Sequence, residues 1–178
     1  MIYTLLADGF EEIEALCPVD VLRRAGLTVK TVGITGKTVT GSHGIAVTAD
    51  LLPSEAKDPI ELLFLPGGMP GSSNLDASAE VDALISRAVA EDAKIAAICA
   101  APFVLGVRGL LKGRRATCYP GFEDRLLGAT YTKSAVEVDG NFITGIGMGA
   151  ALDFALRLVE ILKDKDTAEA IRAGVFAK

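Results

Sequence analysis

The stretch KIAAICAAPFVLG, residues 94–106, decides the fold. A run of small and apolar residues typical of a buried strand leads into Cys99, and Pro102 follows where the first turn of a helix tolerates proline. The pattern therefore predicts a strand that turns into a helix at a cysteine. That cysteine is either an inert core residue or a nucleophile held at the turn.

The rest of the chain repeats this alternation of strand and helix. Strands are expected over 2–6, 27–34, 60–65 and 94–99, a hairpin over 37–50, a short strand within 114–121 and two strands within 132–147; helices are expected over 10–26, 78–93, 101–111, 149–165 and 166–176. Apolar strands separated by helices predict a doubly wound, mainly parallel α/β sheet with helices on both faces. We expect a single domain over residues 1–178, with its ligand site beyond the carboxyl ends of the strands.

Composition excludes several classes of function. The net charge is −5 without a basic run, which argues against nucleic acid as a partner. No apolar stretch reaches the length of a membrane span, and the acidic N-terminal segment does not resemble a signal peptide, so a cytoplasmic protein is expected. Three cysteines without a Cys-x-x-Cys pair and a single histidine predict neither a disulfide framework nor a metal site.

Cys99 is the strongest candidate for chemistry. It stands at the carboxyl end of a strand expected to be central, and the following helix directs its N–H groups at the sulfur, which would stabilise the reactive thiolate. The small neighbours Ala97, Ala100 and Ala101 leave room for a sharp turn. Cys17 and Cys118 are the weaker candidates, since each fits better as a small hydrophobe.

A reactive thiol needs a partner for proton transfer, and no histidine follows Cys99. The helix 10–26 offers glutamates instead. Glu11 and Glu12 fit exposed positions in the first turn of that helix, whereas Glu14 lies on the inner edge, before a kink expected at Pro18. If it is buried, Glu14 is protonated near neutral pH and donates a hydrogen bond to a thiolate.

Two glycine-rich segments remain. Gly67 and Gly68 follow an expected strand, and they form either an oxyanion-binding loop or a simple tight turn. The segment GIGMGA, residues 145–150, fits the start of a dinucleotide-binding motif, but the remaining residues read as helices and leave no room for the second half of that unit. We therefore expect these glycines to line the crevice or to allow close packing.

Taken together, the segments ADGFEEIEALCPVDVLRRAG, LPGG and AAICAAP resemble the ThiJ/PfpI superfamily, in the branch of the Parkinson-associated protein deglycase and its bacterial homologues. The resemblance extends over nearly the whole chain. It implies a flavodoxin-like homodimer with a redox-sensitive cysteine matching Cys99 and a protonated glutamate matching Glu14. It also implies that the backbone amides of Gly68 and Ala100 form an oxyanion pocket.

The activity that the resemblance implies is a cofactor-free glyoxalase or deglycase. Such an enzyme would act through its thiolate on methylglyoxal, a small 2-oxoaldehyde, or on early glycation adducts of amines. The alternative is an oxidative-stress sensor or redox-regulated chaperone, whose cysteine is oxidised to sulfinic acid. A third reading is a flavodoxin-like domain that binds a small molecule without chemistry.

The sequence departs from the family at three places. Tyr119 stands where many members have a histidine near the pocket, and His43 stands at a hairpin position often held by arginine, so both are possible modulators of the site. The segment 145–149 replaces an arginine and a proline at the pocket rim. Proteases of the wider superfamily carry a histidine directly after the cysteine, and Ala100 occupies that position here, which argues against proteolysis.

Overall fold

The computed structural model describes residues 1–177 and has a six-stranded central sheet in the order β2-β1-β5-β6-β10-β9. Its strands are β1 (Ile2–Leu6), β2 (Val29–Gly33), β5 (Leu62–Leu65), β6 (Lys94–Ile98), β9 (Val136–Asp139) and β10 (Phe142–Gly145). All neighbours are parallel except the β9–β10 hairpin at the edge. This confirms the doubly wound, mainly parallel sheet, with its topological switch point between β1 and β5.

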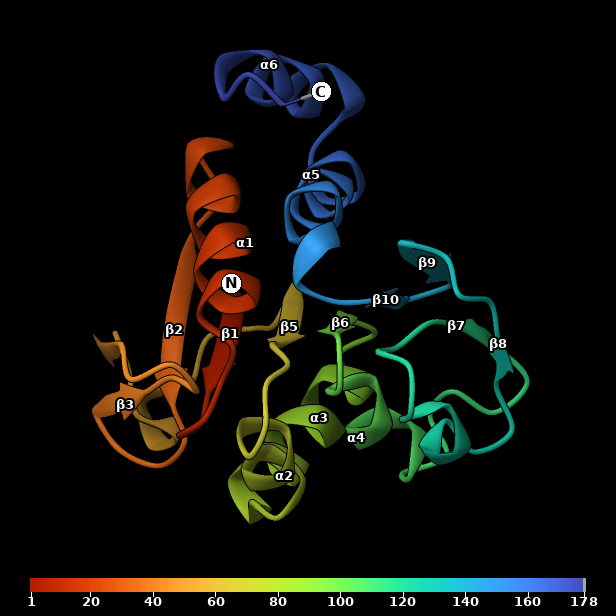
Figure 1. Ribbon diagram of the computed structural model, residues 1–178. Helices are drawn as coiled ribbons and strands as arrows, with labels where there is room; N and C mark the ends of the chain where they lie inside the picture. Colours follow the sequence, from red (N-terminus) through yellow and green to blue (C-terminus); the bar gives the residue numbers. More distant parts are fainter. Residues whose placement is uncertain (178) are drawn as a thin grey trace.

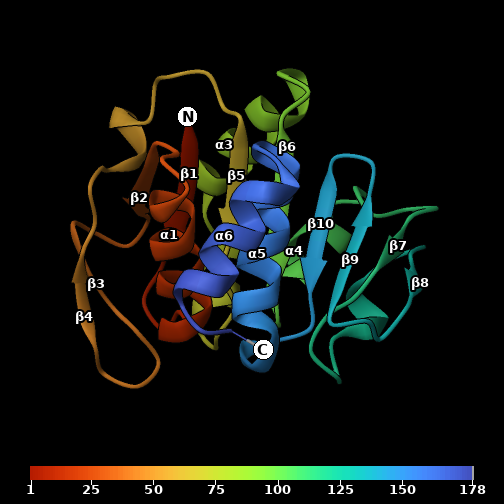
Figure 2. The ribbon, with the colours of Figure 1, turned by 90° about the horizontal axis from the view of Figure 1, so that it is seen from above.

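Helices cover both faces of the sheet (Figures 1 and 2). On one face lie α1 (Glu12–Arg24), α5 (Ala151–Leu162) and α6 (Lys165–Gly174), and on the other lie α2 (Gly71–Asp76), α3 (Ala79–Ala90) and α4 (Pro102–Gly106). Strand residues alternate between the two cores. In β5, for example, Leu63 packs with α3 and α4, and Phe64 packs with α1 and α5. None of the helices within residues 1–177 is long and apolar enough to cross a bilayer.

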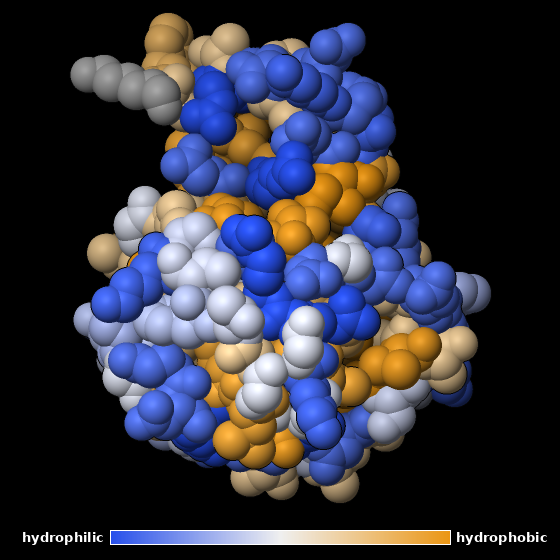
Figure 3. Space-filling model, turned by 90° about the vertical axis from the view of Figure 1, so that its right-hand side faces the viewer, coloured by the Kyte–Doolittle hydropathy of each residue, from blue (hydrophilic) through white to orange (hydrophobic). Residues whose placement is uncertain are grey.

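Two small sheets flank the main one. The expected hairpin forms β3 (Thr38–Thr40) and β4 (Ala46–Thr48), whereas β7 (Arg115–Ala116) and β8 (Thr130–Tyr131) pair in parallel at the other side of the molecule. On that side, a hollow between β9 and the helices α5 and α6 is lined by both apolar and charged side chains (Figure 3). The strand expected within 114–121 is β7, which is only two residues long and lies outside the main sheet.

The helix after Cys99 is shorter than the sequence predicts. It was expected over 101–111, but α4 ends at Gly106. A Cβ atom at Gly106 would overlap the backbone carbonyl of Arg125, and Gly109 has a φ of 72°, in the left-handed region where helices stop. The sequence expectation also missed α2, a helix of six residues that directly follows the loop containing Gly67 and Gly68.

Candidate active site

The carboxyl ends of β1, β5, β6 and β10 meet at one edge of the sheet, and Cys99 stands at the end of β6. The backbone of Cys99 has a φ of 64°, a left-handed conformation that costs a residue with a side chain about 1–3 kcal/mol. Its N–H donates to the Gly145 carbonyl at 2.9 Å, and its carbonyl accepts from the Tyr119 N–H at 2.8 Å. Neighbouring backbone therefore holds the cysteine in a strained turn with its side chain partly exposed.

Glu14 lies against this cysteine. Its side chain is almost fully buried and interacts with the Cys99 side chain and with the backbone of Gly67 and Met148. Burial raises the pKa of Glu14 from 4.5 to about 7. Among the described residues, its Oε2 has no hydrogen-bond partner of good geometry. A buried carboxyl group with an unused oxygen beside a thiol is suited to holding and transferring a proton.

The backbone amides of Gly68 and Ala100 point at the Cys99 sulfur and lower its pKa by hydrogen bonding. Burial and the negative charge of ionised Glu14 outweigh them and raise the pKa of the thiol to about 12. The expected stabilisation of a thiolate by the N–H groups at the start of the helix is therefore present in the Ala100 amide, but it does not set the net pKa while Glu14 is ionised. When the proton resides on Glu14, the carboxyl group no longer repels a negative charge on the sulfur and can donate to it, while burial still opposes that charge.

Gly67 makes the contact between cysteine and glutamate possible. A Cβ atom at position 67 would overlap both the Glu14 Oε2 and the Cys99 Cβ atoms. Gly68 has a φ of 92° and lies against the backbone of 9–11, so it also requires glycine. The interpretation of this segment as a simple turn is incomplete, since its backbone packs directly on the reacting groups.

The glycine-rich segment 145–150 lines the other wall of the site. Gly147 lies beside Glu14 and the Tyr119 ring, and Gly145 packs tightly on Ile98 and Phe154. Both predicted roles, lining the crevice and allowing close packing, are confirmed. A shallow apolar hollow of about 440 Å³ continues from here along Tyr119, Met148 and their neighbours.

His43 of the hairpin forms an ion pair with Glu12 of α1, apart from the pair of reacting groups. The Glu12 Oε1 accepts from the His43 N–H at 2.7 Å, and its Oε2 lies 2.8 Å from the His43 Nδ1. Burial opposes ionisation of Glu12, but these hydrogen bonds lower its pKa to about 2, and Glu12 in turn raises the pKa of His43. The expectation of an exposed Glu12 is wrong, since its side chain is 6% exposed.

Glu11, Glu12 and His43 bring possible ligand atoms within 4.8 Å of one another, a proximity that the sequence did not predict. Hydrogen bonds account for their positions. The Glu11 Oε2 accepts from the Glu14 N–H at 2.7 Å and thereby caps α1, while both oxygens of Glu12 are used by the hairpin. This arrangement fixes the first turn of α1, and with it Glu14, against the hairpin.

The profile of the DJ-1/PfpI family matches residues 1–161. The chain belongs to the DJ-1/PfpI family.

Relatives in this family cover most of the chain. It is 36% identical to the Parkinson disease protein 7 homolog of Danio rerio, over 98% of this chain and 95% of that protein. It is 38% identical to protein DJ-1 homolog B of Arabidopsis thaliana over 92% of this chain, but spans only 38% of that longer protein. A further relative, from Pyrococcus abyssi, is named a deglycase and is 32% identical over 89% of this chain and 97% of that protein. Another, from Caenorhabditis elegans, is named a glutathione-independent glyoxalase and is 33% identical over 86% of this chain and 83% of that protein.

Solved structures of the DJ-1/PfpI family share the fold. A cysteine-to-alanine mutant of a DJ-1 superfamily protein from Salmonella typhimurium has a TM-score of 0.94 and 36% identity, covering 99% of this chain and 98% of that one. An oxidized DJ-1 from Toxoplasma gondii also has a TM-score of 0.94 and 36% identity, with coverage of 98% and 97%. These likenesses confirm the flavodoxin-like fold predicted from the resemblance to the superfamily.

Proposed function

We propose that this protein is a cofactor-independent glyoxalase or deglycase that uses Cys99 as its nucleophile. The observation that carries the proposal is the buried Glu14 carboxyl group, with a pKa raised to about 7, in contact with a cysteine in a strained turn. The names of the deglycase and glyoxalase relatives support the same class of reaction. The substrate is a small 2-oxoaldehyde such as methylglyoxal, or an amine that carries its early adduct.

The reaction begins with the proton on Glu14 and the negative charge on sulfur. The thiolate adds to the aldehyde carbon, and Glu14 donates its proton to the resulting oxyanion, which gives a neutral hemithioacetal. The amides of Gly68 and Ala100, which face the sulfur, stabilise negative charge at this position.

Glu14, now ionised, then removes the proton from the former aldehyde carbon and returns it to the neighbouring carbon, while the hydroxyl proton of the first carbon passes to the oxygen of the second. The first carbon is oxidised and the second is reduced, so a thioester of lactate forms without an external oxidant. Water hydrolyses the thioester and releases lactate, and one proton returns to the Cys99–Glu14 pair. The sum is methylglyoxal plus water giving lactate and one proton, which is released to solvent. For a glycated amine, the thiolate bonds to the carbon that carries the nitrogen as the C–N bond breaks, Glu14 protonates the leaving amine, and the same hemithioacetal follows.

The test is lactate formation from methylglyoxal without glutathione. Cys99→Ser is expected to abolish it, and Glu14→Gln is expected to lower it by about 10²-fold or more, since general acid–base catalysis contributes about that much. Cys17→Ser is the matched control, because Cys17 is also partly exposed and packs on the same core, and it is expected to keep full activity. Full activity in Cys99→Ser would refute the mechanism.

A second candidate function is oxidation sensing, alone or as the trigger of a chaperone activity. The oxidized Toxoplasma gondii neighbour and the two amides at the sulfur favour it. The Cys99 thiol would react with two molecules of hydrogen peroxide to give a sulfinic acid and two waters, and protonated Glu14 would donate to a new oxygen. Mass spectrometry after mild peroxide is expected to find two added oxygens at Cys99. Preferential oxidation of Cys17 or Cys118 would count against this function.

We further propose a cytoplasmic homodimer, on the family resemblance. Ile13 on α1 and Ile45 in the hairpin are each about half exposed and offer apolar surface. Light scattering during gel filtration is expected to give twice the 18.5 kDa mass of the chain. A mass of one chain at micromolar concentration would contradict the dimer.

A further inference from the structure

The two amides that face the Cys99 sulfur belong to segments that lead into two very short helices. Gly68 precedes α2, and the Ser72 N–H donates to its carbonyl at 2.9 Å. Ala100 precedes α4, and the Phe103 N–H donates to its carbonyl at 3.0 Å. Helices of six and five residues are marginal by themselves, so tertiary contacts must set their orientation. Whatever fixes α2 against α4 therefore fixes the two amides relative to each other.

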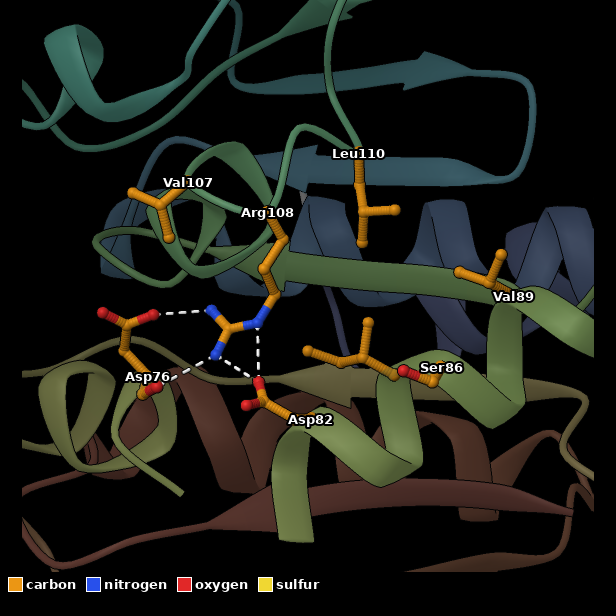
Figure 4. Close-up of a pocket in the computed structure, with 8 residues that line it drawn as sticks. Asp76, Asp82, Ser86, Val89, Val107, Arg108 and Leu110 are labelled. Atoms are coloured by element: carbon orange, nitrogen blue, oxygen red, sulfur yellow. Dashed lines mark hydrogen bonds and ion pairs between the residues drawn. The ribbon is translucent and has the colours of Figure 1, made fainter. Parts of the chain in front are cut away.

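Arg108 makes that link at the opposite ends of the same helices (Figure 4). Its Nη1 donates to the Val104 carbonyl of α4 at 2.7 Å and to the Asp76 carboxylate, and its Nη2 donates to the Asp76 carbonyl at the end of α2 at 2.9 Å. Asp82, in the first turn of α3, accepts from the same guanidinium, at 2.8 Å from Nε, but belongs to neither α2 nor α4. The Arg108 side chain is only 20% exposed, which limits screening of these contacts by solvent.

We propose that Arg108 is a positioning residue for the Cys99 site. It ties the carboxyl ends of α2 and α4 together, and so holds the Gly68 and Ala100 amides at the sulfur from the far side of these helices. Lysine cannot replace it, because only the planar guanidinium presents several N–H donors in a fixed fork. The inference rests on the proposed function for its effect on catalysis, but its effect on the thiol is independent of any substrate.

The variants separate positioning from folding. Arg108→Gln and Asp76→Asn remove or weaken the link between α2 and α4, and Arg108→Lys keeps only the charge. Asp82→Asn leaves the link between α2 and α4 in place. Arg157→Gln is the matched control, since Arg157 forms an ion pair with Glu160 on the surface of α5. Thermal unfolding of each variant shows how much stability is lost.

The main measurement is the rate of iodoacetamide alkylation of Cys99 against pH, with the site of alkylation checked by mass spectrometry. We expect Arg108→Gln, Arg108→Lys and Asp76→Asn to slow alkylation at neutral pH by about tenfold and to shift its profile to higher pH, because the amides stabilise the thiolate less well. Lactate formation should lose kcat by about 10- to 100-fold with little change in KM. Asp82→Asn and Arg157→Gln should change either rate less than about threefold.

The outcomes distinguish the two proposals. If wild type makes no lactate but the alkylation profiles shift as expected, the proposed function fails and the role of Arg108 stands. If Arg108→Gln and Asp76→Asn are destabilised but alkylate like wild type, Arg108 is merely structural and the inference is overturned. It is also overturned if Arg108→Lys restores the wild-type profile or if Asp82→Asn shifts it as strongly as Asp76→Asn. If Arg108→Gln does not fold, the comparison of Asp76→Asn with Asp82→Asn decides in the same way.

Discussion

Replacing the proposed acid–base residue should stabilise the protein. Glu14 is buried, and its pKa is raised from 4.5 to about 7 in the folded state. Between these values the unfolded chain releases the proton and the folded chain keeps it, so the free energy of unfolding falls as pH rises. Below about pH 4.5 the carboxyl group is neutral in both states and has no such effect. Above about pH 7 the full loss is present.

The size of the loss follows from the two pKa values. The difference between 4.5 and about 7 corresponds to about 3 kcal/mol, at about 1.4 kcal/mol for each pH unit. Glu14→Gln cannot ionise and escapes this loss. The free energy of unfolding of the variant relative to wild type should therefore increase by about 2–3 kcal/mol between about pH 5 and pH 8.

Urea unfolding at several pH values measures this difference directly. Comparing the change with pH, rather than one value, separates ionisation from pH-independent effects of the amide on packing. Glu61→Gln, at an exposed position just before β5, controls for the removal of one negative charge. A difference between Glu14→Gln and wild type that stays constant from pH 5 to pH 8 would show that Glu14 is not held protonated by burial.

Two further substitutions test the close packing at Gly67 and the ion pair of His43 with Glu12. Gly67→Ala should abolish lactate formation and cost about 1–3 kcal/mol of stability, because the added Cβ atom overlaps Glu14 and Cys99. Gly149→Ala is the control, since a Cβ atom there meets open space. Equal activity of the two variants would refute the packing argument. His43→Ala should destabilise the protein most below about pH 6.5, where His43 is charged in both the folded and the unfolded state, and less as pH rises through its raised folded pKa. If urea unfolding shows that the variant loses more free energy of unfolding as pH rises, the ion pair with Glu12 is contradicted.

Much of the fold was predictable from local patterns. Runs such as 62–65 and 94–98 are apolar on both faces, which only a sheet covered on both sides can bury. Because such strands are parallel, the residues after them meet at one edge, and this placed Glu14, Gly68 and Cys99 together. The weakest expectation was helix length after Cys99, although Gly106 and Gly109 carried the stop signal.

What escaped prediction depends on contacts between distant segments. The shift of the Cys99 pKa is set first by burial and then by the charge of Glu14, which sequence position alone does not reveal. The burial of Glu12 follows from the hairpin folding over α1, since Gly41 and His43 pack on it from 30 residues away. The role of Gly67 as the contact point between Glu14 and Cys99 likewise needed three elements in place.

The central claim is that Cys99 and Glu14 share one proton, and the pH profile of Cys99 alkylation tests it most directly. The account predicts that the alkylation rate of wild type rises through about pH 7, as the pair loses its first proton, and that Glu14→Gln loses this step. Wild type that alkylates only near the ordinary thiol pKa of about 8.5, with the same profile in Glu14→Gln, would contradict the account.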